Sequence, residues 1–114
     1  MSRNASAHRT SRWPVHWLML YGNDDFVGNG TVLDIRPRQW HAEGPMPVQP
    51  GMRLNIWVWP PGKPDGLHIG DATVLWVKGY AFGLHVEDLN PVDHEWLTQF
   101  LDRAPGLWLI PRAA

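Results

Sequence analysis

Residues 52–59 alternate strictly between two kinds of side chain, and this alternation constrains the fold more than any other feature. Met52, Leu54, Ile56 and Val58 occupy one set of positions, and Arg53, Asn55, Trp57 and Trp59 occupy the other. Successive side chains of a β-strand point to opposite faces, so a period of two predicts a strand with one buried face. The proline- and glycine-rich residues 60–66 then predict a hairpin loop.

Five further segments have strand character and are separated by short turns. They are residues 15–21, 31–35, 40–43, 67–77 and 80–86, and the fourth of them predicts a bend near Gly70. One face is predicted to carry Val15, Trp17, Met19 and Tyr21 in the first segment and Tyr80, Phe82, Leu84 and Val86 in the last. Residues 22–25 supply turn chemistry, because glycine allows positive φ and short polar side chains bond to their own backbone.

One helix is predicted after the strands. Asn90 is a suitable N-cap, Pro91 is a suitable first helical residue, and the acids Asp93 and Glu95 suit the first turns. The apolar stripe is predicted at Val92, Trp96, Phe100 and Arg103, with Leu97 and Leu101 beside it. Residues 105–106, proline and glycine, are predicted to end the helix. Five to six antiparallel strands and one helix predict an all-β fold, a small closed barrel with the helix at one end.

The size and composition of the chain narrow the function classes. With 114 residues it is one domain, and without cysteine it has neither a disulfide framework nor a thiolate zinc site. A net charge of -1 supplies no overall field that attracts a nucleic-acid polymer or a membrane surface. No apolar run approaches the ~18 residues of a membrane span, and the first residues lack the apolar core of a signal peptide. We therefore expect a cytoplasmic protein with no nucleic-acid polymer as partner and no membrane insertion.

The chain divides into three parts. Residues 1–12 contain three arginines, no acid and no periodicity, which predicts a flexible basic arm. Residues 13–104 are predicted to form the barrel and its helix, and residues 105–114 a C-terminal tail. The apolar run 107–110 in this tail either docks on its own barrel or contacts a partner chain, so the oligomeric state stays open.

A basic cluster is predicted around the turn that follows the strand at residues 31–35. Asp34 lies near the end of this strand, Arg36 and Arg38 lie at the turn, and Arg9 and Arg12 lie in the arm. An anionic nucleotide is the natural ligand of such a cluster, because a guanidinium presents a planar fork of donors to a phosphate. In the alternative interpretation, Arg9 belongs to a solvated tail and Asp34 forms a structural ion pair with one of the arginines.

Several short segments carry a resemblance to a known family. Arg12 is followed closely by Pro14 and the first strand, residues 30–35 lead into the turn, and residues 72–76 and 82–84 fit later strands. In this order and spacing, over about residues 8–103, the chain resembles the PilZ domain, the bacterial receptor module for cyclic di-GMP. The resemblance implies a six-stranded antiparallel β-barrel with one C-terminal α-helix. It also implies a regulatory module without catalysis, in which the arm wraps the ligand, the turn completes the pocket, and a surface is reoriented toward a partner protein.

The family signature is R-x-x-x-R in the arm and [D/N]-x-S-x-x-G at the turn between the second and third strands. Arg12 matches the second arginine, and Asp34 matches the acid. His8 stands at the first arginine, Arg36 at the serine and Gln39 at the glycine. By this resemblance the candidate ligand-binding residues are Arg9 (a substitute for the missing arginine), Arg12, Asp34, Arg36 (an added phosphate contact or an obstruction), Gln39 and Trp40 (a stacking partner for guanine or a barrel plug).

These departures leave two interpretations of function. Losing one bidentate contact costs about 1–3 kcal/mol, and losing two moves a micromolar receptor toward millimolar affinity. The chain is then either a cyclic di-GMP-binding regulatory module or a degenerate PilZ domain. In the second case it acts as a protein–protein adaptor through an aromatic or C-terminal apolar surface.

The tryptophans suggest a third, less favoured class of function, a glycan- or nucleic-acid-binding barrel. The chain has eight of them, and Trp57 and Trp59 share one strand face. They either form a stacking platform for bases or sugars or pack under the helix or against the proline-rich loop.

No nucleophile or acid–base pair can be placed with a partner, so an enzyme is not expected. The six histidines lie on separate elements without the spacing of a zinc site, and no cofactor is expected.

Overall fold

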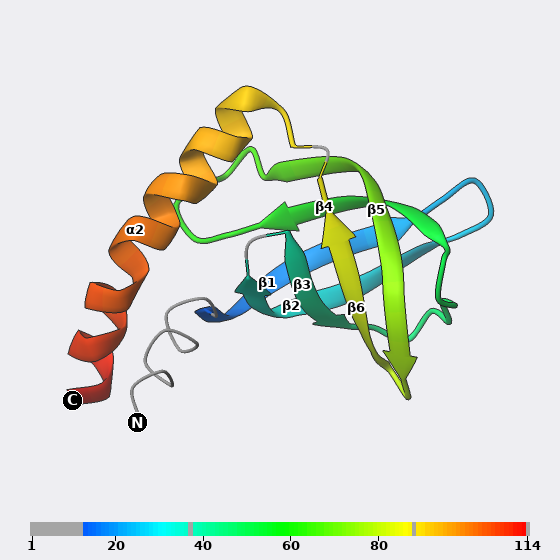
Figure 1. The fold of residues 1–114 in the computed structure, drawn as a ribbon, viewed down its shortest axis with the longest axis horizontal. Helices are drawn as coiled ribbons and strands as arrows, with labels where there is room; N and C mark the ends of the chain where they lie inside the picture. The colour runs from blue at the N-terminus through cyan, green and yellow to red at the C-terminus, as the bar shows by residue number, and fades with distance from the viewer. Residues whose placement is uncertain (1–12, 37, 88, 114) are drawn as a thin grey trace, which may run out of the picture.

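A closed β-barrel forms most of the protein. The computed structural model describes residues 13–36, 38–87 and 89–113, with residues 103–113 described by their backbone alone. The strands are β1 (Trp13–Gly22), β2 (Val27–Arg36), β3 (Gln39–Glu43), β4 (Arg53–Trp59), β5 (Leu67–Lys78) and β6 (Ala81–Val86). They close in the order β1-β2-β3-β6-β5-β4, with antiparallel neighbours throughout, and the helix α2 (Pro91–Ala113) follows (Figure 1). The predicted six-stranded antiparallel barrel with one C-terminal helix is confirmed; the arm, residues 1–12, lies outside the described residues.

The barrel interior is filled by the alternating positions that the sequence singles out. In β4, Leu54, Ile56 and Val58 are at most 1% exposed, whereas the residues between them face outward. Burying one such side chain contributes roughly 1.5–3 kcal/mol relative to leaving it in water. The same core includes Trp17, Met19, Tyr21, Val32, Ile35, Trp40, Ala42, Leu67, Ile69, Ala72, Val74, Phe82, Leu84 and Val86.

The inward face predicted for the last strand is wrong at one position. Phe82, Leu84 and Val86 are buried as expected, but Tyr80 is 73% exposed. The reason is local: Gly79 has a φ of +62° and turns the chain after β5, and β6 begins only at Ala81. Tyr80 therefore lies in the hairpin turn and not on the strand.

A register shift lies where the sequence predicts a bend in the fifth strand. Leu54 faces Ala72 across the β4–β5 pair, but Ile56 faces Ile69, so the segment around Gly70 contains one extra residue. An extra residue on one strand increases local twist and bends it, which helps a small sheet to close on itself.

The helix begins at its predicted cap. The backbone N–H of Asp93 donates to Asn90 Oδ1 at 2.8 Å, and Asn90 Nδ2 donates back to Asp93 Oδ2 at 3.1 Å. Asp93 is only 6% exposed and also forms an ion pair with Lys63, with Nζ 3.4 Å from Oδ1. The pair joins the β4–β5 loop to the first turn of α2.

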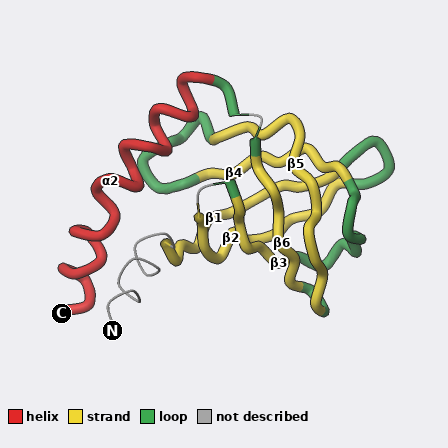
Figure 2. Tube along the Cα trace, in the orientation of Figure 1, coloured by secondary structure: helices red, strands yellow, loops and turns green. Residues whose placement is uncertain are grey.

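The barrel-facing stripe of α2 starts at Asp93, not at Val92 as predicted. Trp96, Leu97, Phe100 and Leu101 pack against the core, at the spacings of one helix face counted from position 93. Val92 lies one residue earlier, about 100° around the helix, and is 71% exposed. The Phe100 ring lies 5.3 Å from the Trp17 ring, and Figure 2 shows the helix along one end of the barrel.

The helix continues past its predicted end. Its backbone remains helical to Ala113, beyond residues 105–106, so the boundary predicted there is wrong. A proline inside a helix removes one backbone hydrogen bond and favours a bend, yet it leaves the remaining bonds of the helix in place. Within the described part of the chain, no helix combines the length and apolar character that a membrane span requires.

Candidate functional site

The β2–β3 turn carries the residues that the sequence singles out. Arg36 at the end of β2 pairs with Gln39 at the start of β3, so the hairpin is tight. Arg38 has a φ of +65°, a left-handed conformation that costs a non-glycine residue about 1–2 kcal/mol. Its carbonyl accepts a 2.9 Å hydrogen bond from the N–H of Val86. The positive φ of this turn falls at Arg38, and Gln39 stands in a paired strand position. The backbone at position 39 therefore does not require the glycine of the family signature.

Three side chains form a row on the outer face next to this turn. Asp34 faces His41 across the β2–β3 pair, His41 faces Gly83 on β6, and Gly83 faces Trp76 on β5. His41 Nδ1 lies 3.3 Å from Asp34 Oδ2, and their side chains are 33% and 6% exposed. The imidazole of His41 lies 5.4 Å from the Trp76 ring at an interplanar angle of 50°. The row therefore runs unbroken from a nearly buried carboxylate to an indole.

A small pocket lies beside this row. We call it the outer-face pocket; its volume is about 110 Å³, and it is lined by Asp34, Arg36, Gln39, Trp40, His41 and Trp76. Four of these six were predicted as ligand-binding residues, and the fold brings them together. The pocket offers carboxylate and amide acceptors, amide and guanidinium donors, and an aromatic wall, a combination suited to a planar polar ligand.

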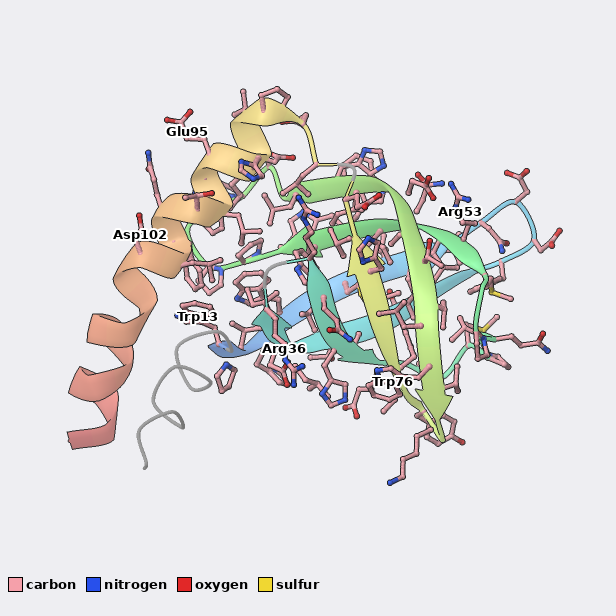
Figure 3. The ribbon with its side chains drawn as sticks, viewed as in Figure 1. Trp13, Arg36, Arg53, Trp76, Glu95 and Asp102 are labelled. Carbon is pink, nitrogen blue, oxygen red and sulfur yellow. The ribbon has the colours of Figure 1, made fainter. Side chains whose placement is uncertain are left out.

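A larger pocket lies on the other side of the turn, between the barrel end and α2. We call it the helix-side pocket; its volume is about 570 Å³, and it is lined by Trp13, Ile35, Arg36, Arg38, Trp40, Val86, Glu87, Leu89, His94, Leu97, Thr98, Leu101 and Asp102. Arg36 and Trp40 line both pockets. Arg36 therefore borders both pockets. Figure 3 labels Arg36 near the helix-covered end of the barrel and Arg53 near the opposite end.

The acidic rim of the helix-side pocket is partly neutralised. Glu87 Oε2 lies 2.9 Å from His85 Nε2. The hydrogen bond from His85 is the main cause of a lowered pKa at Glu87, and the positive charge of Arg38 adds to it. Glu87 therefore stays ionised at neutral pH and offsets part of the positive charge at the turn.

The remaining predicted site residues have different outcomes. Arg9 and Arg12 lie outside the described residues. Trp40 is 1% exposed, and its ring lies edge-on to the Trp17 ring at 6.2 Å. This is the position of a barrel plug, because the surrounding core covers the faces that a stacked base would need. Asp34 has His41 as a partner across the hairpin.

The sequence analysis missed His41, Trp76 and Trp13. His41 is two residues from Gln39, as Asp34 is two residues from Arg36, so a tight hairpin would have placed the two opposite each other. For Trp76 the sequence held a weaker signal, the glycine at position 83, because a glycine inside a strand marks the close approach of another group. Nothing in the sequence identified the approaching group as Trp76.

The two outward tryptophans of β4 show neither predicted arrangement fully. Trp57 is 41% exposed, and its ring is stacked on His68 with centroids 4.0 Å apart at an angle of 15°. Trp59 is 37% exposed and lies against Gly66 of the loop that follows β4, where a Cβ would stand 2.9 Å from the indole nitrogen. One ring is therefore covered by a histidine and the other lies against the loop.

A third hollow, of about 470 Å³, lies on the outer face near the far end of the barrel. It is lined by Leu18, Asn29, Gly30, Thr31, Glu43, Gly44, Pro45 and Tyr80. Leu18 is 65% exposed and Tyr80 73% exposed, so two large apolar side chains border it.

No set of three histidine, aspartate or glutamate side chains with metal-binding geometry occurs among residues 13–36, 38–87 and 89–113. Comparison of the chain with protein-family models, curated proteins and solved structures finds no match.

Proposed function

We propose that this protein is a regulatory module that binds a cyclic dinucleotide at the β2–β3 turn. The observation that carries the proposal is the convergence of Asp34, Arg36 and Gln39 in the outer-face pocket. These are the three turn positions of the PilZ signature, and the resemblance names cyclic di-GMP as the ligand. The proposal includes no catalytic step.

The positive charge at the turn supports an anionic nucleotide as ligand. Arg36 lines both pockets, and Arg38 lines the helix-side pocket, so two arginines of the turn border the candidate site. Guanidinium groups bind phosphate through two parallel hydrogen bonds, which gives both affinity and orientation. We assign Arg36 to phosphate binding because it replaces the small serine of the signature at a position that borders both pockets.

The arm supplies the second half of the site in this proposal. Trp13 lines the helix-side pocket, and Arg12 is the preceding residue in the sequence. Arg12 and Arg9 then close over the ligand from the arm, as the resemblance implies. A ligand held between arm and barrel changes the surface near α2, and that surface is the signal read by a partner protein.

Calorimetric titration of the full chain with cyclic di-GMP tests this function, with GTP as a control ligand. We expect micromolar binding, and Arg36→Ala and Arg12→Ala should each weaken it about 5- to 150-fold, the loss of one bidentate contact. Arg53→Ala is the matched control, because Arg53 is an exposed arginine at the start of β4 that pairs with Asp71. No heat up to about millimolar ligand, or equal affinity in Arg36→Ala, would contradict the proposal.

A protein–protein adaptor is the second candidate, favoured by the exposed Leu18 and Tyr80 beside the third hollow. Large exposed apolar side chains around a groove are typical of protein-binding surfaces. Under this alternative, cyclic di-GMP does not bind, and Leu18→Glu with Tyr80→Glu abolishes capture of a partner that the parent chain retains. The double variant should keep its thermal midpoint, because both side chains are exposed.

A further inference from the structure

Trp76 has an unusual setting for an exposed aromatic residue. Its residue pair on β6 is Gly83, and a Cβ at position 83 would overlap the indole. The indole therefore lies across the β6 backbone and reaches the ring of His41 on β3. Glycine inside a strand weakens the strand, and here the absence of a side chain at position 83 lets the indole approach the β6 backbone closely.

Trp76 lines the outer-face pocket and is partly exposed. One side of the indole lies on Gly83, and 38% of the residue remains exposed. The neighbouring lining residues are polar: Asp34, Arg36, Gln39 and His41. An aromatic face beside such a set offers stacking and hydrogen bonding to the same planar ligand. Besides Trp76 and His41, the lining contains one further aromatic side chain, Trp40, which is too buried to stack on a ligand.

We infer that Trp76 is the stacking partner for the planar base of the nucleotide bound at the outer-face pocket. The inference rests on the proposed function and deepens it, because it names the group that holds the base. Stacking places the ring of the base over the indole and its polar edge toward Gln39 and Asp34. The phosphate extends toward Arg36 at the turn. Stacking of one base on an aromatic side chain changes affinity by about 5- to 150-fold.

Calorimetry with cyclic di-GMP measures the contribution of the stack. We expect Trp76→Ala to weaken binding about 5- to 150-fold and Trp76→Phe to weaken it less, because a phenyl ring still stacks. Gly83→Ala keeps every atom of Trp76 but displaces the indole, so it should weaken binding as well. Trp57→Ala is the matched control, a tryptophan of similar exposure outside this lining. Thermal unfolding confirms that each variant is folded.

The NMR signals of the tryptophan indole N–H groups give a second readout that does not depend on the cyclic dinucleotide. The full chain is titrated with GMP and, separately, with ribose 5-phosphate, which lacks a base; Trp76→Phe assigns the Trp76 signal. GMP should shift the Trp76 signal and leave that of Trp57 in place, and ribose 5-phosphate should shift neither. A Trp76 signal that stays unmoved at about 10 mM GMP overturns the inference.

The two proposals fail in distinguishable ways. If Arg36→Ala loses cyclic di-GMP and Trp76→Ala binds as tightly as the parent chain, the stacking inference is wrong and the proposed function stands. If cyclic di-GMP does not bind but GMP shifts the Trp76 signal, the proposed ligand is wrong and the base-stacking site stands.

Discussion

The contact between Asp93 and Lys63 is expected to hold α2 on the barrel, and replacing Asp93 by alanine tests this directly. Asp93 Oδ1 lies 3.4 Å from Lys63 Nζ, and Oδ2 accepts from Asn90 Nδ2 at 3.1 Å and from the N–H of His68 at 3.3 Å. One carboxylate therefore connects the β4–β5 loop, the start of β5 and the cap of the helix. Asp93→Ala removes all three contacts at once.

The size of the effect follows from the burial of the pair. The side chains of Lys63 and Asp93 are 14% and 9% exposed, so neither charge is well hydrated. Breaking a buried ion pair by removing one partner costs about 3–5 kcal/mol, chiefly because the other charge is left unpaired. Lys63 keeps some contact with water, so we expect about 3 kcal/mol. For a domain of this size that lowers Tm by about 12 °C.

Urea unfolding followed by far-UV circular dichroism and tryptophan fluorescence measures this free energy. Lys63→Met should cost less than Asp93→Ala, because Asp93 keeps two N–H donors while the apolar stem of residue 63 is retained. The double variant should cost less than the sum of the two single changes, since no unpaired charge remains. Asp102→Ala, an exposed aspartate on the same helix, is the control and should stay within about 0.5 kcal/mol.

A cost below about 1 kcal/mol for Asp93→Ala, together with additive effects in the double variant, would refute this reasoning. The helix would then be held by Trp96, Leu97, Phe100 and Leu101 alone, and the ion pair would be incidental.

Three further predictions concern the barrel itself. Tyr21→Phe should cost about 1–3 kcal/mol in urea unfolding, because the Tyr21 hydroxyl donates to the Met46 carbonyl at 2.9 Å and accepts from its N–H at 2.8 Å. Burial raises the pKa of Tyr21. The stability from its neutral hydroxyl is therefore present below about pH 10 and is lost as pH rises through the folded pKa. A Tyr21→Phe variant whose stability falls with alkaline pH as that of the parent chain does would disprove this. Arg38→Gly should stabilise the chain by about 1 kcal/mol, because glycine adopts the positive φ without strain, and a lower Tm would show that the arginine side chain matters more. The hydrogen bond from Arg53 lowers the pKa of Asp71, so Arg53→Ala should raise that pKa in an NMR pH titration, and an unmoved titration midpoint would mean that the pair does not persist in solution.

The candidate site was predictable where it depends on one hairpin. Asp34, Arg36 and Gln39 belong to a tight turn whose strands are neighbours in sequence, so their convergence follows from local chain geometry. Trp40 was ambiguous because strand alternation alone does not say whether an inward ring plugs the barrel or faces a ligand. The closed barrel resolved this by packing Trp17 against it.

Trp76 could not be found in this way. It reaches His41 only because β6 lies between β3 and β5 in the barrel, so that Gly83 pairs with both residues. The three positions come from three strands, and their alignment depends on the register shift that separates the Val74–Leu84 and Trp76–Gly83 pairs. A shift of this kind is set by barrel closure, which sequence alternation does not encode.

The sequence by itself determined that six segments are strands, although β2 begins at Val27 and not at residue 31. It also determined which face of three of these strands points inward and where α2 begins. These properties depend on residues close together in the chain: a period of two for the strands, and the Asn90 cap for the helix. Only the tertiary structure decided the pairing of Asp93 with Lys63, the outward position of Val92 and the reach of Trp76 over Gly83. Each of these depends on contacts between distant segments, which exist only once the barrel has closed and the helix has docked on its end.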